Sequence, residues 1–175
     1  MVDPSPNNAS PCVGCGLCCN GVLHWGAKAS VSEVDLLLSR GHELTEIGGR
    51  KYFSQPCLHE VDRGCSIYLD RYEVCRKYKC GLLRRYESGE IALKAAQQQI
   101  KTAYDLLETV TDSDPSAKFL TGRRERRTKL AGELKSDRSE TEAKTGIRLL
   151  NIIALDLYLE RWFLNKSAKP SNEAG

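Results

Sequence analysis

Residues 12–19 read Cys12-Val13-Gly14-Cys15-Gly16-Leu17-Cys18-Cys19. Three thiols at two-residue gaps on a tight loop can converge on one centre, and the two glycines allow backbone conformations that would strain other residues. The adjacent Cys18 and Cys19 are harder to place on the same ion, because neighbouring side chains generally point in different directions. One of these two cysteines is therefore a candidate ligand of a second centre.

The cysteines of the 175-residue chain are all in its first 80 residues. Gaps of seven, nine and four residues separate the four later cysteines, and together they do not make a standard zinc-finger spacing. Eight thiols could furnish two four-thiolate sites, or one cluster with spare or redox-active thiols, and the spacing alone does not partition them. The candidate metal ligands are Cys12, Cys15, Cys18, Cys19, Cys57, Cys65, Cys75 and Cys80.

The amino terminus has neither a positively charged start nor an apolar run, so we expect no secretory signal and a cytoplasmic protein. Dense cysteines in a reducing compartment indicate metal or redox chemistry before disulfides. The first three cysteine positions match the start of the bacterial ferredoxin pattern, which favours an iron-sulfur cluster of the 4Fe-4S type, with zinc as the alternative. Either four-thiolate centre would carry a net charge of about −2.

Basic residues are interspersed with the later cysteines, where they could donate hydrogen bonds to sulfur. These cations are Arg63, Arg71, Arg76, Lys77 and Lys79. Among the three histidines we consider only His59, two residues beyond Cys57, as a substitute metal ligand. A second basic run at residues 123–127 is a candidate phosphate contact, but such runs are usually solvated helix faces, so we do not expect a nucleic-acid partner.

The fold class we predict is mostly α, with an irregular cysteine-rich N-terminal half packed on C-terminal helices. Residues 1–11 should be a disordered lead-in, 12–85 the cysteine-cluster metal-binding module, 86–166 a helical region that completes the core, and 167–175 a flexible tail. No window is apolar enough for a membrane span.

Local signals place the expected elements along the chain. Ser30 and Glu33 have capping-box spacing before a short helix that Gly41 would end. Extended pieces are expected at 51–53 and 66–68, with Gly64 placed to turn, and a helical pattern follows Asp70. A further helix should cover about 90–111, and after it Asp114 suits an N-cap and Pro115 the first helical position.

The last helix should begin at a capping box formed by Ser139 and Glu142 and become the spine of the core. One apolar stripe recurs at the helical interval, and a second set of leucines and isoleucines widens it, so we expect cover on more than one side. The first stripe consists of Ile147, Leu150, Ile153, Leu157 and Leu164, and the widening set of Leu149, Ile152, Leu155 and Leu159.

The cysteine pattern resembles the YkgJ family, the zinc- or iron-chelating CxxCxxCC domain. The matching elements are Cys12 to Cys19, Pro56-Cys57 and the stretch C-S-I-Y-L-D-R-Y-E-V-C-R-K-Y-K-C from Cys65 to Cys80, so the resemblance covers roughly residues 10 to 85. The chain departs from the family at Tyr72 and Leu58, where members often have proline; neither change removes a ligand. The resemblance implies a metal-chelating module, and the family is itself similar to the cysteine-rich part of flagellin lysine methylases.

The function we favour is a metal-binding protein with thiolate-ligated iron-sulfur cluster(s) that serves redox chemistry, maturation or support of a protein partner. One alternative is a structural zinc-binding interaction module. The other is a metal-dependent enzyme that modifies a protein or peptide, for which the sequence offers no nucleotide-binding loop and no nucleophile-base pattern. No catalytic residue is assigned.

Overall fold

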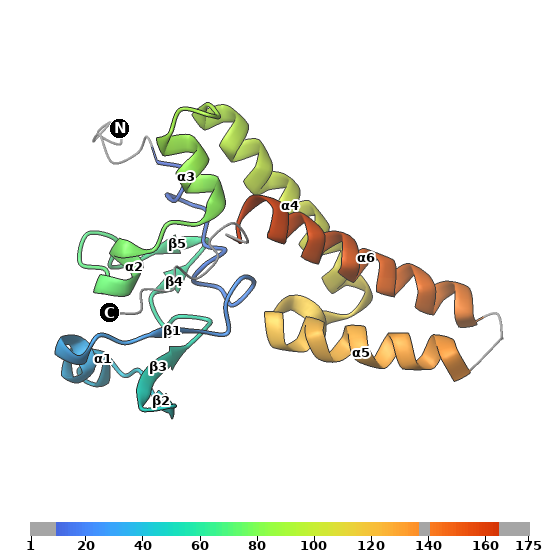
Figure 1. Ribbon diagram of the computed structural model, residues 1–175, viewed down its shortest axis with the longest axis horizontal. Coiled ribbons are helices and arrows are strands. Elements are labelled where there is room, and N and C mark those ends of the chain that lie inside the picture. The colour runs from blue at the N-terminus through green and yellow to red at the C-terminus, as the bar shows by residue number, and fades with distance from the viewer. Residues whose placement is uncertain (1–9, 137–140, 165–175) are drawn as a thin grey trace, which may run out of the picture.

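The computed structural model describes residues 10–136 and 141–164, and within them helices predominate over two small sheets (Figure 1). The prediction of a mostly helical chain with an irregular cysteine-rich half is confirmed at that level. The helices are α1 (Val34–Ser39), α2 (Glu73–Lys77), α3 (Gly81–Glu87), α4 (Leu93–Ser113), α5 (Leu120–Ser136) and α6 (Thr141–Trp162), with the 3₁₀ helices η2 (Val31–Glu33) and η3 (Pro115–Lys118).

The larger sheet is antiparallel, with strand order β1-β3-β2 (β1 Gly26–Lys28, β2 Leu44–Ile47, β3 Arg50–Ser54). Gly48 and Gly49 form the two-residue turn between β2 and β3, and both have positive φ, as the hairpin turns that match strand twist require. The extended piece expected at 51–53 is thus confirmed within β3.

A second hairpin, β4 (Glu60–Val61) with β5 (Gly64–Cys65), carries one of the cysteines. Two expectations are wrong here. Asp62 and Arg63, with φ of 47° and 64°, make the turn instead of Gly64. Residues 66–68 are a turn and not a strand, because the Tyr68 N–H donates back to the Cys65 carbonyl at 3.1 Å.

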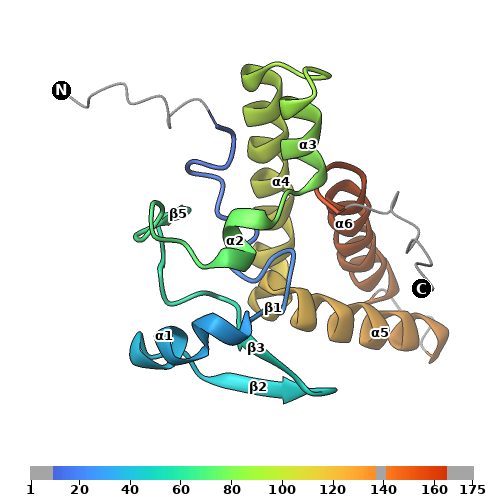
Figure 2. The ribbon, with the colours of Figure 1, turned by 60° about the vertical axis from the view of Figure 1, so that its left-hand side comes forward.

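The cysteine-rich half and the helices share one apolar core. Leu17, Val22 and Leu23 are buried together with residues of α3, α4, α5 and α6. A separate, smaller cluster of Ala29, Leu37, Phe53 and Tyr72 lies under β1, α1 and β3. In Figure 2 the sheet and α1 stand to one side of the long helices. The predicted packing of the N-terminal half on the C-terminal helices is therefore confirmed.

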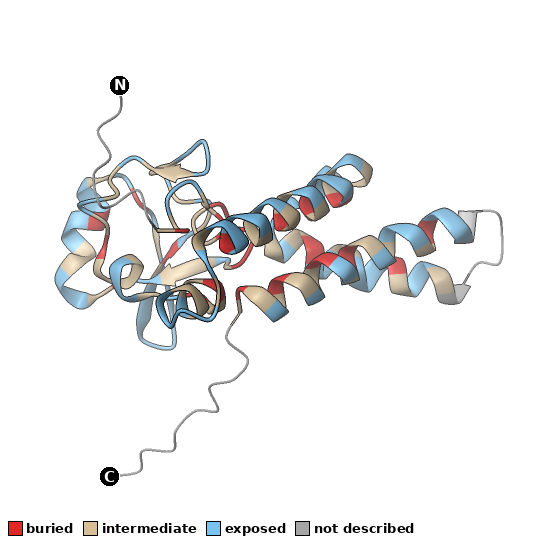
Figure 3. Cartoon of the chain, turned by 90° about the horizontal axis from the view of Figure 1, so that it is seen from above, coloured by how far each residue is buried: buried red, intermediate tan, exposed pale blue. Residues whose placement is uncertain are grey.

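Helix α6 packs against α4 and α5 mainly through the predicted widening set, and not through the first stripe. Ile152, Leu155, Leu159 and Phe163 are buried, whereas three members of the expected spine are more than half exposed. The exposed members are Ile147, Leu150 and Leu157. Figure 3 shows that the buried residues of this helical part follow its inner side, so the expected cover on several sides is wrong.

The capping box expected at Ser30 is also wrong. The Ser30 hydroxyl donates to the Glu33 carboxylate at 3.0 Å instead of capping the backbone of η2. Both Glu33 oxygens accept the backbone N–H of Glu73 at 2.9 Å, so this carboxylate satisfies the start of α2, 40 residues away. Farther along, the expected N-cap is confirmed, because Asp114 accepts the Ser116 N–H at 3.1 Å and Pro115 begins η3.

Arg123, from the basic run, is 1% exposed and ties the two halves together. Its guanidinium donates to the Asp156 carboxylate of α6 at 2.9 Å and to the Val22 carbonyl of the cysteine loop at 2.7 Å. Within the same run, Arg126 pairs with Asp114, and Arg127 with Asp156. These arginines therefore have structural partners within the chain.

Three expectations fall outside the described residues: the greater part of the lead-in, the capping residue Ser139 and the tail after 166. Across the described ranges, no helix combines the length and apolarity that crossing a membrane requires.

Candidate functional site

The loop that carries the first four cysteines is held by its own backbone and by one tyrosine of α4. The N–H groups of Cys19 and Asn20 both donate to the Gly16 carbonyl, at 2.8 and 2.9 Å. The Tyr104 hydroxyl donates to the Cys15 carbonyl at 2.6 Å and accepts from the Asn20 amide at 3.1 Å. These bonds fix the path of the loop, and with it the positions of its thiols.

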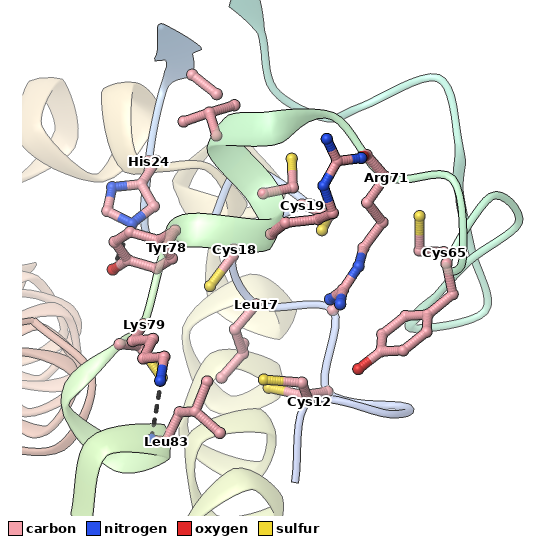
Figure 4. A pocket seen from close by; sticks show the side chains of 18 of the residues that line it. Cys12, Leu17, Cys18, Cys19, His24, Cys65, Arg71, Tyr78, Lys79 and Leu83 are labelled. Carbon is pink, nitrogen blue, oxygen red and sulfur yellow. Dashed lines mark hydrogen bonds between the residues drawn. The ribbon is translucent and has the colours of Figure 1, made fainter. Parts of the chain in front are cut away.

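Seven of the eight cysteines line one cavity of about 670 Å³ (Figure 4). Cys57 is not among the lining residues, but its N–H donates to the Cys19 carbonyl at 2.8 Å, which fastens it to the same loop. All eight are free thiols. The structure therefore gathers cysteines from the first loop, from the β5 hairpin, from α2 and from the start of α3.

Four of these thiols form a first group around the start of α3. Cys80 precedes α3 and its sulfur accepts the Leu83 N–H at 3.4 Å. Burial raises the pKa of Cys18 well above its ordinary value, and the charges of Cys80, Cys15, Cys19 and Cys12 raise it further. Burial, and then the charge of Cys80, likewise raise the pKa of Cys12. The members of this first thiol group are Cys12, Cys15, Cys18 and Cys80.

The contributions of neighbouring thiol charges to the pKa values likewise relate the other four thiols to one another. Burial raises the pKa of Cys19 to about 12, and the next contributions come from the charges of Cys75, Cys57 and Cys65. Burial raises the pKa of Cys75 to about 11, followed by the charges of Cys57 and Cys65. The members of this second thiol group are Cys19, Cys57, Cys65 and Cys75. Among the thiols, Cys80 has the largest effect on the pKa of Cys18 and Cys75 the largest on that of Cys19, although Cys19 also raises the pKa of Cys18.

The described side chains do not adopt a finished metal centre. Within the ranges that the structure covers, no three His, Cys, Asp or Glu side chains are arranged to hold one ion. Seven thiols have raised pKa values and are therefore neutral near pH 7 unless a cation stabilises their thiolate forms. They are Cys12, Cys15, Cys18, Cys19, Cys57, Cys75 and Cys80. A bound metal ion is a cation of that kind, and thiolate sulfur is a preferred ligand of zinc and of iron-sulfur clusters.

The basic residues singled out from the sequence divide into two sets. Arg63, Arg71, Arg76 and Lys79 line the cavity, whereas the exposed Lys77 forms an ion pair with Glu73. Arg63 stacks over the Tyr104 ring, with its guanidinium carbon 3.9 Å from the centroid. Arg71 stacks over Tyr68 at 3.7 Å, and its Nε is buried with no hydrogen-bond partner in the part of the chain that the structure describes.

The histidine closest to the cavity is not the expected one. His24 lines it and its Nε2 lies 2.9 Å from the Tyr78 hydroxyl, with the two rings edge to face. His59 instead has its Nε2 3.0 Å from the Tyr72 hydroxyl and is not among the lining residues. Sequence reasoning missed His24 and Tyr78. Tyr78 lies between two cysteines of the motif, so its position in the motif was a usable signal.

No protein-family model matches the chain, and neither a curated protein nor a solved structure matches it. The resemblance to the YkgJ family therefore depends on the spaced residues between Cys12 and Cys80 alone, and membership remains a prediction.

Proposed function

We propose that this protein binds metal through two four-thiolate centres, at least one of them an iron-sulfur cluster, and serves redox chemistry, maturation or support of a protein partner. The observation that carries the proposal is the gathering of thiols from four separate segments around one cavity. The first centre would use Cys12, Cys15, Cys18 and Cys80, and the second Cys19, Cys57, Cys65 and Cys75.

The donor set fits such groups chemically. Each set offers four soft sulfur ligands, which is the complement of a 4Fe-4S cluster and of a closed zinc site. An iron-sulfur cluster would supply a one-electron carrier at this position. The chain itself supplies the candidate ligands, the half-buried surroundings of Cys15 and Cys18, and the cations that line the cavity.

The orphaned Nε of Arg71 is a second point of fit. A buried donor without an acceptor costs about 1–3 kcal/mol, so native proteins rarely leave one unsatisfied. A centre with a net charge of about −2 provides acceptors for such a donor. The cavity therefore offers candidate sulfur ligands together with a counter-charge suited to a four-thiolate group.

The test is metal analysis of protein purified without oxygen. Iron with acid-labile sulfide and broad visible absorption would support the proposal. A colourless protein with stoichiometric zinc would contradict its iron-sulfur part and support a structural zinc module. Folded protein with neither metal would overturn metal binding altogether.

The partition into two centres has its own test in adjacent residues. Cys18→Ser and Cys19→Ser should each remove about half of the bound metal. The double variant Cys18→Ser/Cys80→Ser should lose no more than Cys18→Ser alone, because both residues serve one centre. Cys18→Ser/Cys19→Ser should lose nearly all of it. Equal losses in the two double variants would contradict the partition.

A structural zinc role is the second candidate, because the cysteine-rich half has little core of its own. Its separate apolar cluster contains only four buried residues among those that the structure describes. Small domains with so little buried apolar surface commonly depend on a metal or disulfides for stability. This observation does not distinguish zinc from iron, and the metal analysis decides between them.

A further inference from the structure

Arg71 occupies a special place among the cations of the cavity. It follows the turn after Cys65 and comes just before α2, and its side chain extends into the cavity between Cys65 and Cys18 in the view of Figure 4. The Tyr68 ring supports the guanidinium from one side, at 3.7 Å from its carbon to the ring centroid. A stacked guanidinium loses side-chain freedom before it meets any ligand.

Arg71 lines the cavity together with thiols of both groups. Those of the first group are Cys12, Cys15, Cys18 and Cys80, and those of the second are Cys19, Cys65 and Cys75. Arg76 lines the same cavity but directs its guanidinium to Glu33, 3.9 Å away. Arg63 is stacked over Tyr104. Of these three arginines, Arg71 is the one with a buried side-chain nitrogen that has no acceptor among the described residues.

The buried Nε–H of Arg71 is also a hydrogen-bond donor that has no acceptor among the described residues. Arginine keeps its proton at any physiological pH, so its guanidinium in the cavity is a permanent cation. A cation between two groups that become anionic together attracts both of them.

On the basis of the proposed function, we propose that Arg71 is a positioning residue shared by the two thiolate centres. Its guanidinium lies between them and offsets the repulsion of their charges. Two centres of about −2 each repel one another, and this repulsion weakens the second binding event after the first. A positive charge placed between them reduces that penalty. Arg71 therefore allows both centres to be filled in the same molecule.

The experiment measures how occupancy of the second centre changes metal affinity at the first. Zn²⁺ is titrated against a competing chelator, without oxygen, in the full chain and in Cys65→Ser, where the second centre is disabled. The same pair is then measured in the Arg71→Gln background. With Arg71 present, the first centre should have the same affinity in both chains within about threefold. In the Arg71→Gln variant, a filled second centre should weaken the first by about tenfold.

Two further variants separate charge from structure. Arg71→Lys keeps the positive charge and should keep the coupling within about threefold. Arg50→Gln removes an equal charge from the exposed end of the β2–β3 hairpin and should leave the coupling unchanged. In protein that holds an iron-sulfur cluster, Arg71→Gln should also lower the midpoint potential, because loss of a cation favours the oxidised form.

The inference and the proposed function fail differently. If the unaltered chain binds no Zn²⁺ and no iron, the metal proposal fails. If it binds metal at both centres and Arg71→Gln shows the coupling of the unaltered chain, only the role of Arg71 fails. Should Arg71→Lys behave like Arg71→Gln, charge is not the cause, and the inference is overturned.

Discussion

Gly16 lies directly against the backbone of Arg63, so closely that a β-carbon on Gly16 would come within 2.8 Å of the Arg63 Cα. The contact joins the first cysteine loop to the turn of the β4–β5 hairpin. Because Cys65 is in that hairpin and Cys19 in that loop, this approach helps to bring two members of the second thiol group together.

Gly16→Ala should therefore destabilise the protein more than Gly14→Ala does. Both glycines have positive φ, 63° and 74°, so alanine at either costs about 1–2 kcal/mol in the left-handed region. A β-carbon at Gly14 meets nothing within 4 Å, whereas at Gly16 it adds about 1–3 kcal/mol of overpacking. Urea unfolding of both variants in the same metal state measures the difference. Equal losses would show that the contact is not tight in solution.

The buried Arg123 should be among the largest single contributors to the link between the halves. Arg123→Met leaves the Val22 carbonyl without its 2.7 Å donor and removes one partner of Asp156, at a cost of about 3 kcal/mol. Arg124→Met, its exposed neighbour on α5, should change the free energy of unfolding by less than about 0.5 kcal/mol. Chemical denaturation compares the two variants. A similarly small loss in both would contradict the role of Arg123 in linking the cysteine-rich half to the helices.

Gly122 and Gly132 on α5 should respond to alanine in opposite directions. A β-carbon at Gly122 would be 1.9 Å from the Ser116 carbonyl oxygen, so Gly122→Ala must displace η3 or the start of α5. At Gly132 nothing lies within 4 Å, and alanine should stabilise the helix by about 0.5–1 kcal/mol. Thermal unfolding should show a lower midpoint for the first variant and a higher one for the second. A stabilising Gly122→Ala would refute the close contact.

The Asp114 carboxylate should make stability depend on pH in acid. Burial disfavours its charged form, but hydrogen bonds from Ser116 and the charge of Arg126 outweigh burial, so the pKa of Asp114 is lowered in the folded state. Because the pKa is lower in the folded state, the ionised carboxylate stabilises the folded chain at pH values above its unfolded pKa of about 3.9. This contribution to the free energy of unfolding is lost as pH falls through the folded pKa.

Asp114→Asn isolates this charge because the amide oxygen can still cap η3. Between pH 6 and pH 3 the unaltered chain should lose more unfolding free energy than the variant does. Thiol protonation affects both proteins alike and cancels in the comparison. Parallel pH curves would contradict the lowered pKa.

Local chemistry explains which features could be predicted from the sequence. Asp114 and Pro115 mark the start of a helix, the first by capping it and the second by its fixed φ. Both effects act within a few residues, so the prediction from the sequence is confirmed at η3. The Ser30 and Glu33 spacing also satisfied a local rule, yet Glu33 accepts from Glu73, 40 residues away. Partners at that separation depend on the folded chain.

The thiol groups show the same limit. Spacing suggested that Cys18 and Cys19 serve different centres, and this stays a prediction, because the charge of Cys19 still contributes to the raised pKa of Cys18. The spacing of the cysteines could not assign Cys80 to the first group, because only the packing of α3 against the first loop brings that thiol near Cys12, Cys15 and Cys18. Arg123 looked like part of a solvated charge run, since sequence does not reveal that the Val22 carbonyl faces it.

In helix α6 periodicity predicted two buried faces, of which the structure buries one, and substitutions on the two faces test that difference. Both faces carry leucine and isoleucine at helical intervals, so composition alone does not indicate which one packs against α4 and α5. Leu155 is 0% exposed and Leu157 is 60% exposed. Leu155→Ala should therefore cost about 2–5 kcal/mol through lost burial and a residual cavity, whereas Leu157→Ala should stay within about 0.5 kcal/mol of the unaltered chain. Urea unfolding followed by helical circular dichroism measures both. A large loss for Leu157→Ala would mean that its face is covered in solution, and a small loss for Leu155→Ala would mean that the helix is turned relative to its neighbours.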